Sequence, residues 1–150
     1  MIIRKLDKKE YKQAASLAMD IYMECGQEDF DEIGQETFRS FVSSEQLMDE
    51  LTMYGAFMNE DLIGIMGTKQ AGKHISLFFI RKEYHRQEIG RLLFDYAFND
   101  CPVEEMSVNS STYAVEFYQS LGFEKTDDKQ VTNGITYTPM IRRSSIEKQQ

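Results

Sequence analysis

Apolar residues recur along the first third of the chain with the spacing of amphipathic helices. Residues 2–4 are short and β-branched and predict a first strand. A helix is expected from Asp7, because Glu10 follows three residues later in a capping pattern. The apolar side of this helix consists of Tyr11, Ala14, Ala15, Ala18, Ile21 and Tyr22. The polar stretch 24–34 predicts a loop. One or two further short helices are predicted by Phe38, Phe41, Val42, Leu47 and Leu51.

The pattern changes to that of strands in the middle of the chain. Residues 54–58, 62–68 and 74–80 are strand-like, and turns at 59–61 and 71–73 separate them, which predicts a three-stranded meander. The third segment is apolar almost without interruption, as expected for a central strand with both faces covered.

Two strand–helix units complete the pattern. Helical spacing at 90–99 and 113–121 flanks a strand at 105–109, and Gly122 stands where a C′ glycine ends a helix. Closing strands are predicted at 123–125 and 135–141. The chain contains no internal repeat or linker, so we expect one mixed α/β domain over residues 1–143, followed by a polar tail at 144–150.

Composition narrows the classes of partner. The 150 residues carry 17 basic and 25 acidic side chains, a formal net charge of −8, which disfavours binding to nucleic acid and to anionic membranes. Charges in the first ten residues disfavour a signal peptide, and no apolar run approaches about 20 residues, so the expected location is the cytoplasm. Cys25 and Cys101 lack metal-ligand spacing; we expect neither a disulfide nor a metal site, but packing as small apolar residues.

Residues 81–91 run against the overall charge. The segment contains four basic and two acidic side chains, a local net charge of +2. It lies just after the apolar strand and at the start of a predicted helix. A helix N-terminus offers free N–H groups and partial positive charge, so the segment suits an anion. A solvated basic turn explains the charge equally well.

A resemblance to a known family begins at residues 84–93, whose sequence is YHRQEIGRLL. This segment resembles the acetyl-CoA loop of the GNAT N-acetyltransferases, which carries Gln/Arg-x-x-Gly-x-Gly/Ala between its fourth strand and third helix. Residues 114–123, AVEFYQSLGF, resemble the later A-x-x-F-Y-x-x-L-G-F segment of that family. Residues 133–140 are similar to the closing strands of one bacterial branch. The predicted order of strands and helices is also that of the family, so the resemblance covers nearly the whole chain.

The resemblance implies a GNAT fold, with a central mixed sheet flanked by helices. It also implies direct transfer of the acetyl group of acetyl-CoA, the co-substrate, to a primary amine of a small molecule or peptide. Backbone N–H groups of Phe78, Phe79 and Ile80 are expected to stabilise the oxyanion that forms during transfer. The other residues expected to bind acetyl-CoA are His85, Arg86, Gln87, Glu88, Ile89, Gly90, Arg91 and Ser111.

The loop departs from the family motif at two positions. Aligned on Gly90, His85 stands at the Gln/Arg position and Glu88 at the first glycine. A glutamate there hinders a positive φ and repels a pyrophosphate. This departure motivates an alternative hypothesis, in which the protein has the GNAT fold but serves in binding or interaction without efficient turnover.

The resemblance assigns Tyr118 as the general acid that protonates the departing CoA thiolate; an amphipathic helix tyrosine is the simpler interpretation of its spacing. His74 is a candidate general base, although a histidine at a strand end facing water is as consistent with the pattern.

Residues 24–36 hold six acidic side chains and no basic one. Glu28, Asp29 and Glu32 in this segment are candidates for binding a cationic amine. The alternative interpretation is an acidic loop that is simply solvated. Nine methionines and ten phenylalanines would also suit a longer acyl chain, although they are more simply core. The pattern allows a homodimer through the closing strands but does not require one.

Overall fold

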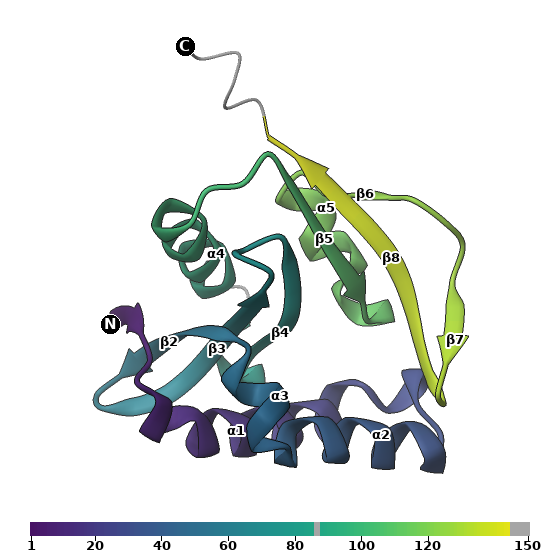
Figure 1. Ribbon diagram of the computed structural model, residues 1–150, viewed down its shortest axis with the longest axis horizontal. Helices are drawn as coiled ribbons and strands as arrows, with labels where there is room; N and C mark the ends of the chain where they lie inside the picture. The colour runs from purple at the N-terminus through teal and green to yellow at the C-terminus, as the bar shows by residue number, and fades with distance from the viewer. Residues whose placement is uncertain (86–87, 145–150) are drawn as a thin grey trace.

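A mixed β-sheet separates two groups of helices in the computed structural model, which describes residues 1–85 and 88–144 (Figure 1). Within these residues the strand order is β1-β2-β3-β4-β5-β8-β6, with β7 paired to β8. The strands are β1 (Ile2–Lys5), β2 (Thr52–Met58), β3 (Asp61–Lys69), β4 (His74–Ile80), β5 (Glu105–Ser110), β6 (Glu124–Lys125), β7 (Gln130–Thr132) and β8 (Ile135–Arg143).

Helices α1 and α2 lie on one side of the sheet, and α4 and α5 lie on the other (Figure 1). The α-helices are α1 (Tyr11–Cys25), α2 (Glu32–Ser43), α3 (Glu45–Asp49), α4 (Ile89–Asp100) and α5 (Val115–Ser120). Short 3₁₀ turns occur at Lys8–Glu10, Gln27–Asp29, Lys82–Tyr84 and Thr112–Ala114.

The predicted fold class is confirmed, and two local predictions need adjustment. Helix α2 begins at Glu32, inside the predicted loop, because the Asp31 side chain caps it by accepting a hydrogen bond from the Gly34 N–H at 2.8 Å. The sequence pattern missed β7, which pairs with β8 across a turn at Asn133 and Gly134, both with positive φ. Of the predicted tail, residues 145–150 lie outside the described residues.

A β-bulge in β4 explains how one strand serves both cores. Ile75 packs in the α4–α5 core, whereas Leu77, two residues later, packs in the α1–α2 core. Residues two apart in a regular strand share a face. Here the register shifts, since Ile75 pairs with Thr68 and Leu77 with Gly67, which leaves Ser76 as the inserted residue.

Strands β4 and β5 diverge just beyond the bulge. Their parallel ladder consists of the two pairs His74↔Ser107 and Ile75↔Val108 among the described residues, while β5 continues to pair with β8 as far as Ser110. The second half of β4 is therefore only partly buried, at Phe78, Phe79 and Ile80. The expectation of a strand covered on both faces holds for its first half and fails where β5 turns away.

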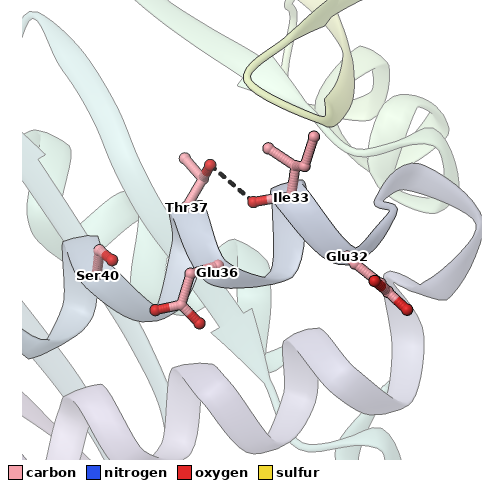
Figure 2. Close-up of a pocket in the computed structure, with 5 residues that line it drawn as sticks. All are labelled: Glu32, Ile33, Glu36, Thr37 and Ser40. Carbon is pink, nitrogen blue, oxygen red and sulfur yellow. Dashed lines mark hydrogen bonds between the residues drawn. The ribbon is translucent and has the colours of Figure 1, made fainter.

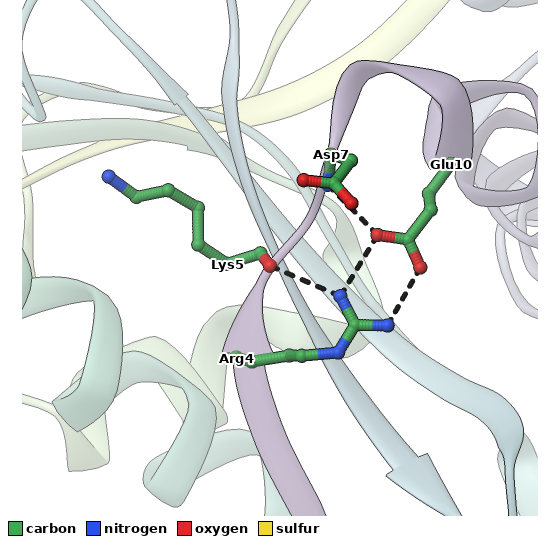
Figure 3. A network of polar contacts seen from close by, with 4 residues as sticks. All are labelled: Arg4, Lys5, Asp7 and Glu10. Carbon is green, nitrogen blue, oxygen red and sulfur yellow. Dashed lines mark hydrogen bonds and ion pairs between the residues drawn. The ribbon is translucent and has the colours of Figure 1, made fainter.

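The predicted pairing of Asp7 with Glu10 at the first helix is present and extends to Arg4 (Figure 3). The Glu10 carboxylate accepts two hydrogen bonds from the Arg4 guanidinium, at 2.9 and 2.8 Å, and one from the Asp7 N–H at 2.9 Å. These bonds, those from Arg4 first, lower the pKa of Glu10 from 4.5 to about 2.

The lowered pKa of Glu10 predicts a pH-dependent contribution to stability. The contribution is present above pH 4.5 and is lost as the pH falls towards about 2, where the folded carboxylate is protonated. The difference in unfolding free energy between the wild type and Glu10→Gln should therefore shrink over this range, as measured by urea unfolding at a series of pH values. Arg4→Gln should give the same profile, and a difference that does not vary with pH would contradict the assignment.

The described residues also bear on two expectations from composition. Cys25 and Cys101 are free thiols and each is half-buried, and Cys25 packs against the α1–α2 core. The Cys101 thiol donates a hydrogen bond to the Ala71 carbonyl at 3.2 Å. No helix in residues 1–85 or 88–144 combines the length and apolar character that crossing a membrane requires.

Candidate functional site

The second half of β4 presents backbone groups to the gap left by β5. The Arg81 N–H donates to the Ile63 carbonyl on β3 at 2.8 Å. Because backbone direction alternates along a strand, Phe78 and Ile80 direct their N–H and C=O groups away from β3 and towards the gap. The Ile80 carbonyl does so visibly, since the His85 ring nitrogen Nε2 lies 2.7 Å from it. This edge can bind a ligand through the main chain.

The first turn of α4 lies beside this edge and is suited to an anion. The helix has 12 residues, and its N-cap, Glu88, makes no side-chain capping bond. The first N–H groups of any α-helix lack intrahelical partners and carry partial positive charge, and here no Glu88 side-chain cap occupies them. The Arg91 guanidinium is held at the same end by the Ser120 carbonyl, at 2.9 Å.

Glu88 has φ 62° and ψ 8°, a left-handed conformation that favours glycine. The backbone at this position therefore has the positive φ that glycine would adopt easily, although the residue is glutamate. Its side chain also places a negative charge there. Arg86 and Gln87, also predicted to bind acetyl-CoA, lie outside the described residues.

Gly90 and His85 fit the predicted loop in different ways. A Cβ at Gly90 would lie 2.8 Å from the Phe117 ring, so a larger residue here would displace that ring. The His85 nitrogen Nε2 carries a proton, because the Ile80 carbonyl can only accept. Ile89 is 2% exposed and packs against Ala56 and Ile63, so its side chain anchors the helix.

Two cavities meet at the gap between β4 and β5. The loop cavity, about 510 Å³, is lined by residues of β4, the start of α4 and α5, including His85, Glu88, Gly90 and Arg91. The aromatic cavity, about 550 Å³, lies among α1, α2, β4, β5 and β8 and includes Tyr22, Phe38, Phe41, Phe79 and Tyr137. Both cavities are lined by Phe78, Tyr113, Ala114 and Tyr118.

Two titratable groups, Tyr113 and Tyr118, line both cavities among the described residues, and Tyr118 is the more buried of the two. Its side chain is 5% exposed, and its ring packs edge-on against Phe78, Phe117 and Phe123, with centroids 5.3–6.0 Å away. Burial, and then the neighbouring Tyr113, raises the pKa of Tyr118 above its ordinary value, so the phenol is protonated at neutral pH. Among the described residues its hydroxyl has no hydrogen-bond partner.

A comparison of the sequence with family models decides the relationship. The model of the acetyltransferase (GNAT) domain matches residues 22–144. The chain belongs to the GNAT acetyltransferase family. The predicted resemblance is thereby confirmed, and the match includes both cavities and Tyr118. No curated protein sequence matches the chain.

Solved GNAT structures share the fold. A GCN5-related N-acetyltransferase from Rhodopseudomonas palustris matches with a TM-score of 0.80 and 17% identity, over 95% of each chain. The PaiA N-acetyltransferase from Thermoplasma acidophilum, solved with coenzyme A, gives 0.74 and 19% over 95% of this chain and 98% of that one. An aminoglycoside 6′-N-acetyltransferase complexed with coenzyme A gives 0.65 and 14%, over 95% and 97%.

The GNAT fold does not bring His74 to either cavity. His74 lies at the start of β4, before the bulge, and its Nδ1 is 2.7 Å from the Ser107 hydroxyl oxygen. Burial, and then Lys69, lowers the pKa of its imidazole. The role of His74 as general base stays a prediction.

A His74→Gln variant tests that role. A general base contributes about 10²- to 10⁴-fold to a rate, whereas a side chain outside both cavities contributes little. We expect His74→Gln to keep kcat/KM within about threefold of the wild type in an assay of CoA thiol release. A hundredfold loss with unchanged unfolding temperature would instead identify His74 as the base.

The three acidic candidates occupy three different environments. Asp29 lines the aromatic cavity but is 3% exposed, and its carboxylate accepts hydrogen bonds from the Thr112 N–H and hydroxyl at 2.7 and 2.5 Å. It thereby ties the 3₁₀ turn after α1 to the 3₁₀ turn before α5. Glu28 is exposed and lines neither cavity. Glu32 lies on the outer surface of α2, in a shallow depression with Glu36 (Figure 2).

Sequence reasoning missed the aromatic wall of the second cavity. The helical spacing of Tyr22, Phe38 and Phe41 predicts helices with an apolar side. Periodicity identifies the face that a helix turns inward, but it does not distinguish a filled core from a cavity. Ser111, predicted for acetyl-CoA, lines this same cavity just before the 3₁₀ turn Thr112–Ala114.

Proposed function

We propose that this protein transfers the acetyl group of acetyl-CoA directly to a primary amine of a small molecule or peptide, with Tyr118 as general acid. One observation carries the proposal: Tyr118 lines both the loop cavity and the aromatic cavity, beside the open edge of β4, and it is more buried than Tyr113, which also lines both. A group that protonates a leaving thiolate must lie between the two substrates, and this position meets that requirement.

The loop cavity fits acetyl-CoA in most respects. The N–H groups at Ile89, Gly90 and Arg91 begin α4 and suit a pyrophosphate. The edge groups of Phe78 and Ile80 suit the amide-bearing arm of CoA. Two structural neighbours were solved with coenzyme A. Among the described residues of this cavity, the acidic side chains Glu88 and Glu116 oppose an anion.

The residues at the gap divide the chemical work. Acetyl-CoA supplies the acetyl group as an activated thioester. The Phe78 N–H faces the gap and would stabilise negative charge that develops on the carbonyl oxygen. The Tyr118 hydroxyl would give its proton to the sulfur as the carbon–sulfur bond breaks, and the amine would release its own proton to water in the aromatic cavity.

Calorimetry with acetyl-CoA tests the proposal directly. We expect saturable binding, and release of free CoA thiol once an acceptable amine is added. The absence of binding at about millimolar acetyl-CoA, which corresponds to less than about 4 kcal/mol of binding free energy, would overturn the proposal.

The left-handed conformation of Glu88 favours a second candidate function. If the loop holds acetyl-CoA too weakly for turnover, the protein is a GNAT-fold binding protein that retains the cavities without the reaction. Substitution of Glu88 separates this candidate from the enzyme.

A further inference from the structure

The aromatic cavity offers little to a polycationic acceptor. Among the described residues, its charged lining consists of Asp29 and Lys69, one of each sign. Asp29 already accepts two hydrogen bonds from Thr112, and Glu28 and Glu32 lie outside the cavity. Buried positive charges need paired carboxylates, so this lining selects against an acceptor with several ammonium groups.

The walls of the cavity suit a flat apolar ring. The Tyr22 ring lies stacked between Phe30 and Phe38, with centroids 4.6 and 4.0 Å away. Phe38 in turn meets Phe79 of β4 edge-on at 5.9 Å. A continuous aromatic wall thus runs from α1 to the strand whose backbone faces the gap, and aromatic ligands pack favourably on such surfaces.

The Tyr22 hydroxyl is the polar end of a side chain in this wall, and protein atoms enclose it. It is a buried side-chain oxygen without a hydrogen-bond partner among the described residues. Burial, and then Asp29 and Asp31, raises the pKa of Tyr22 to about 12, so the hydroxyl is neutral and can both donate and accept. Buried polar groups rarely stay unpaired, which points to a ligand that completes the bond.

We propose that the acceptor is an arylalkylamine whose ring carries an oxygen substituent, and that this oxygen forms a hydrogen bond with the Tyr22 hydroxyl. The ring packs on the aromatic wall while the amine extends towards Tyr118. This inference rests on the proposed function and specifies the class of substrate for the same site.

The test compares three acceptors with the full-length protein and acetyl-CoA: tyramine, 2-phenylethylamine and spermidine. We expect kcat/KM for tyramine, from release of CoA thiol, to exceed that for spermidine by at least about tenfold. One added hydrogen bond should favour tyramine over 2-phenylethylamine by about three- to tenfold. Tyr22→Phe should bring this second ratio to about one.

A second tyrosine of the cavity provides the matched control. Tyr137→Phe removes a hydroxyl that already has partners, since it lies 3.1 Å from the Thr132 hydroxyl and 3.3 Å from Gln130 Oε1. The ratio of tyramine to 2-phenylethylamine should stay at its wild-type value in this variant. If Tyr137→Phe abolishes the ratio and Tyr22→Phe does not, the assignment of Tyr22 is overturned.

The outcomes separate the inference from the function on which it rests. Preference for spermidine, or an unchanged ratio in Tyr22→Phe, overturns the inference alone. The same holds if acetyl-CoA binds by calorimetry while tyramine neither binds nor reacts. If acetyl-CoA itself does not bind, the proposed function fails, and the inference fails with it.

Discussion

Replacement of Tyr118 by phenylalanine should lower kcat by about 10²-fold or more, because general acid catalysis contributes about 10²- to 10⁴-fold. The ring packs against Phe78, Phe117 and Phe123 through its carbon atoms, and Phe keeps these contacts. The Kd for acetyl-CoA should therefore stay within about twofold of the wild type. Steady-state release of CoA thiol and calorimetry measure the two quantities.

The pH dependence sharpens this prediction. Because burial raises the pKa of Tyr118 above its ordinary value, the wild-type phenol keeps its proton at every pH below about 10. The ratio of wild-type to variant kcat should then be constant through the neutral range. A ratio that changes with a midpoint near neutrality would indicate that another group titrates in the step attributed to Tyr118.

Tyr96→Phe is the matched control for the Tyr118 variant. Tyr96 lies on the outer side of α4, is 40% exposed, and lines neither cavity. Its replacement should leave both kcat and the Kd for acetyl-CoA at their wild-type values. Wild-type kcat in Tyr118→Phe, under conditions where chemistry limits the rate, would contradict the role of Tyr118 as general acid.

The sequence predicts those parts of the fold that local rules determine. The turns at 59–61 and 71–73 occur where predicted, and the Asp7–Glu10 pairing is present at the first helix. Each of these features depends on residues within a few positions of one another. The role expected of Tyr118 came from the family resemblance and not from its spacing, which is equally that of a core residue.

The site depends on long-range geometry that local patterns do not contain. Asp29 and Thr112 are 83 positions apart in the sequence. The hydrogen bond between them gives Asp29 a structural role, although the sequence suggests a free acidic side chain. The inserted Ser76 is an ordinary serine in the sequence, yet it sets which side of β4 each later residue faces. The gap itself results from β5 following β8 and leaving β4, which is a property of strand pairing across the sheet.

Replacement of Glu88 by glycine should stabilise the protein and also tighten its binding of acetyl-CoA, for two separable reasons. At φ 62°, glycine avoids the strain of a left-handed side-chain residue, which should raise the free energy of unfolding by about 1 kcal/mol. Loss of the negative charge removes repulsion of the pyrophosphate. Since Glu88 is exposed, this repulsion is screened to about 1 kcal/mol, or roughly fivefold in Kd.

Glu88→Gln separates the two effects, because it removes the charge but keeps a side chain at positive φ. It should tighten acetyl-CoA binding about as much as Glu88→Gly, without the gain in unfolding free energy. A roughly fivefold gain in affinity, together with turnover by the wild type, would describe an enzyme whose loop is weakened but works. A gain of about a thousandfold, with a wild type that turns over no amine, would instead support the GNAT-fold binding protein, since a screened charge alone cannot account for so large a change.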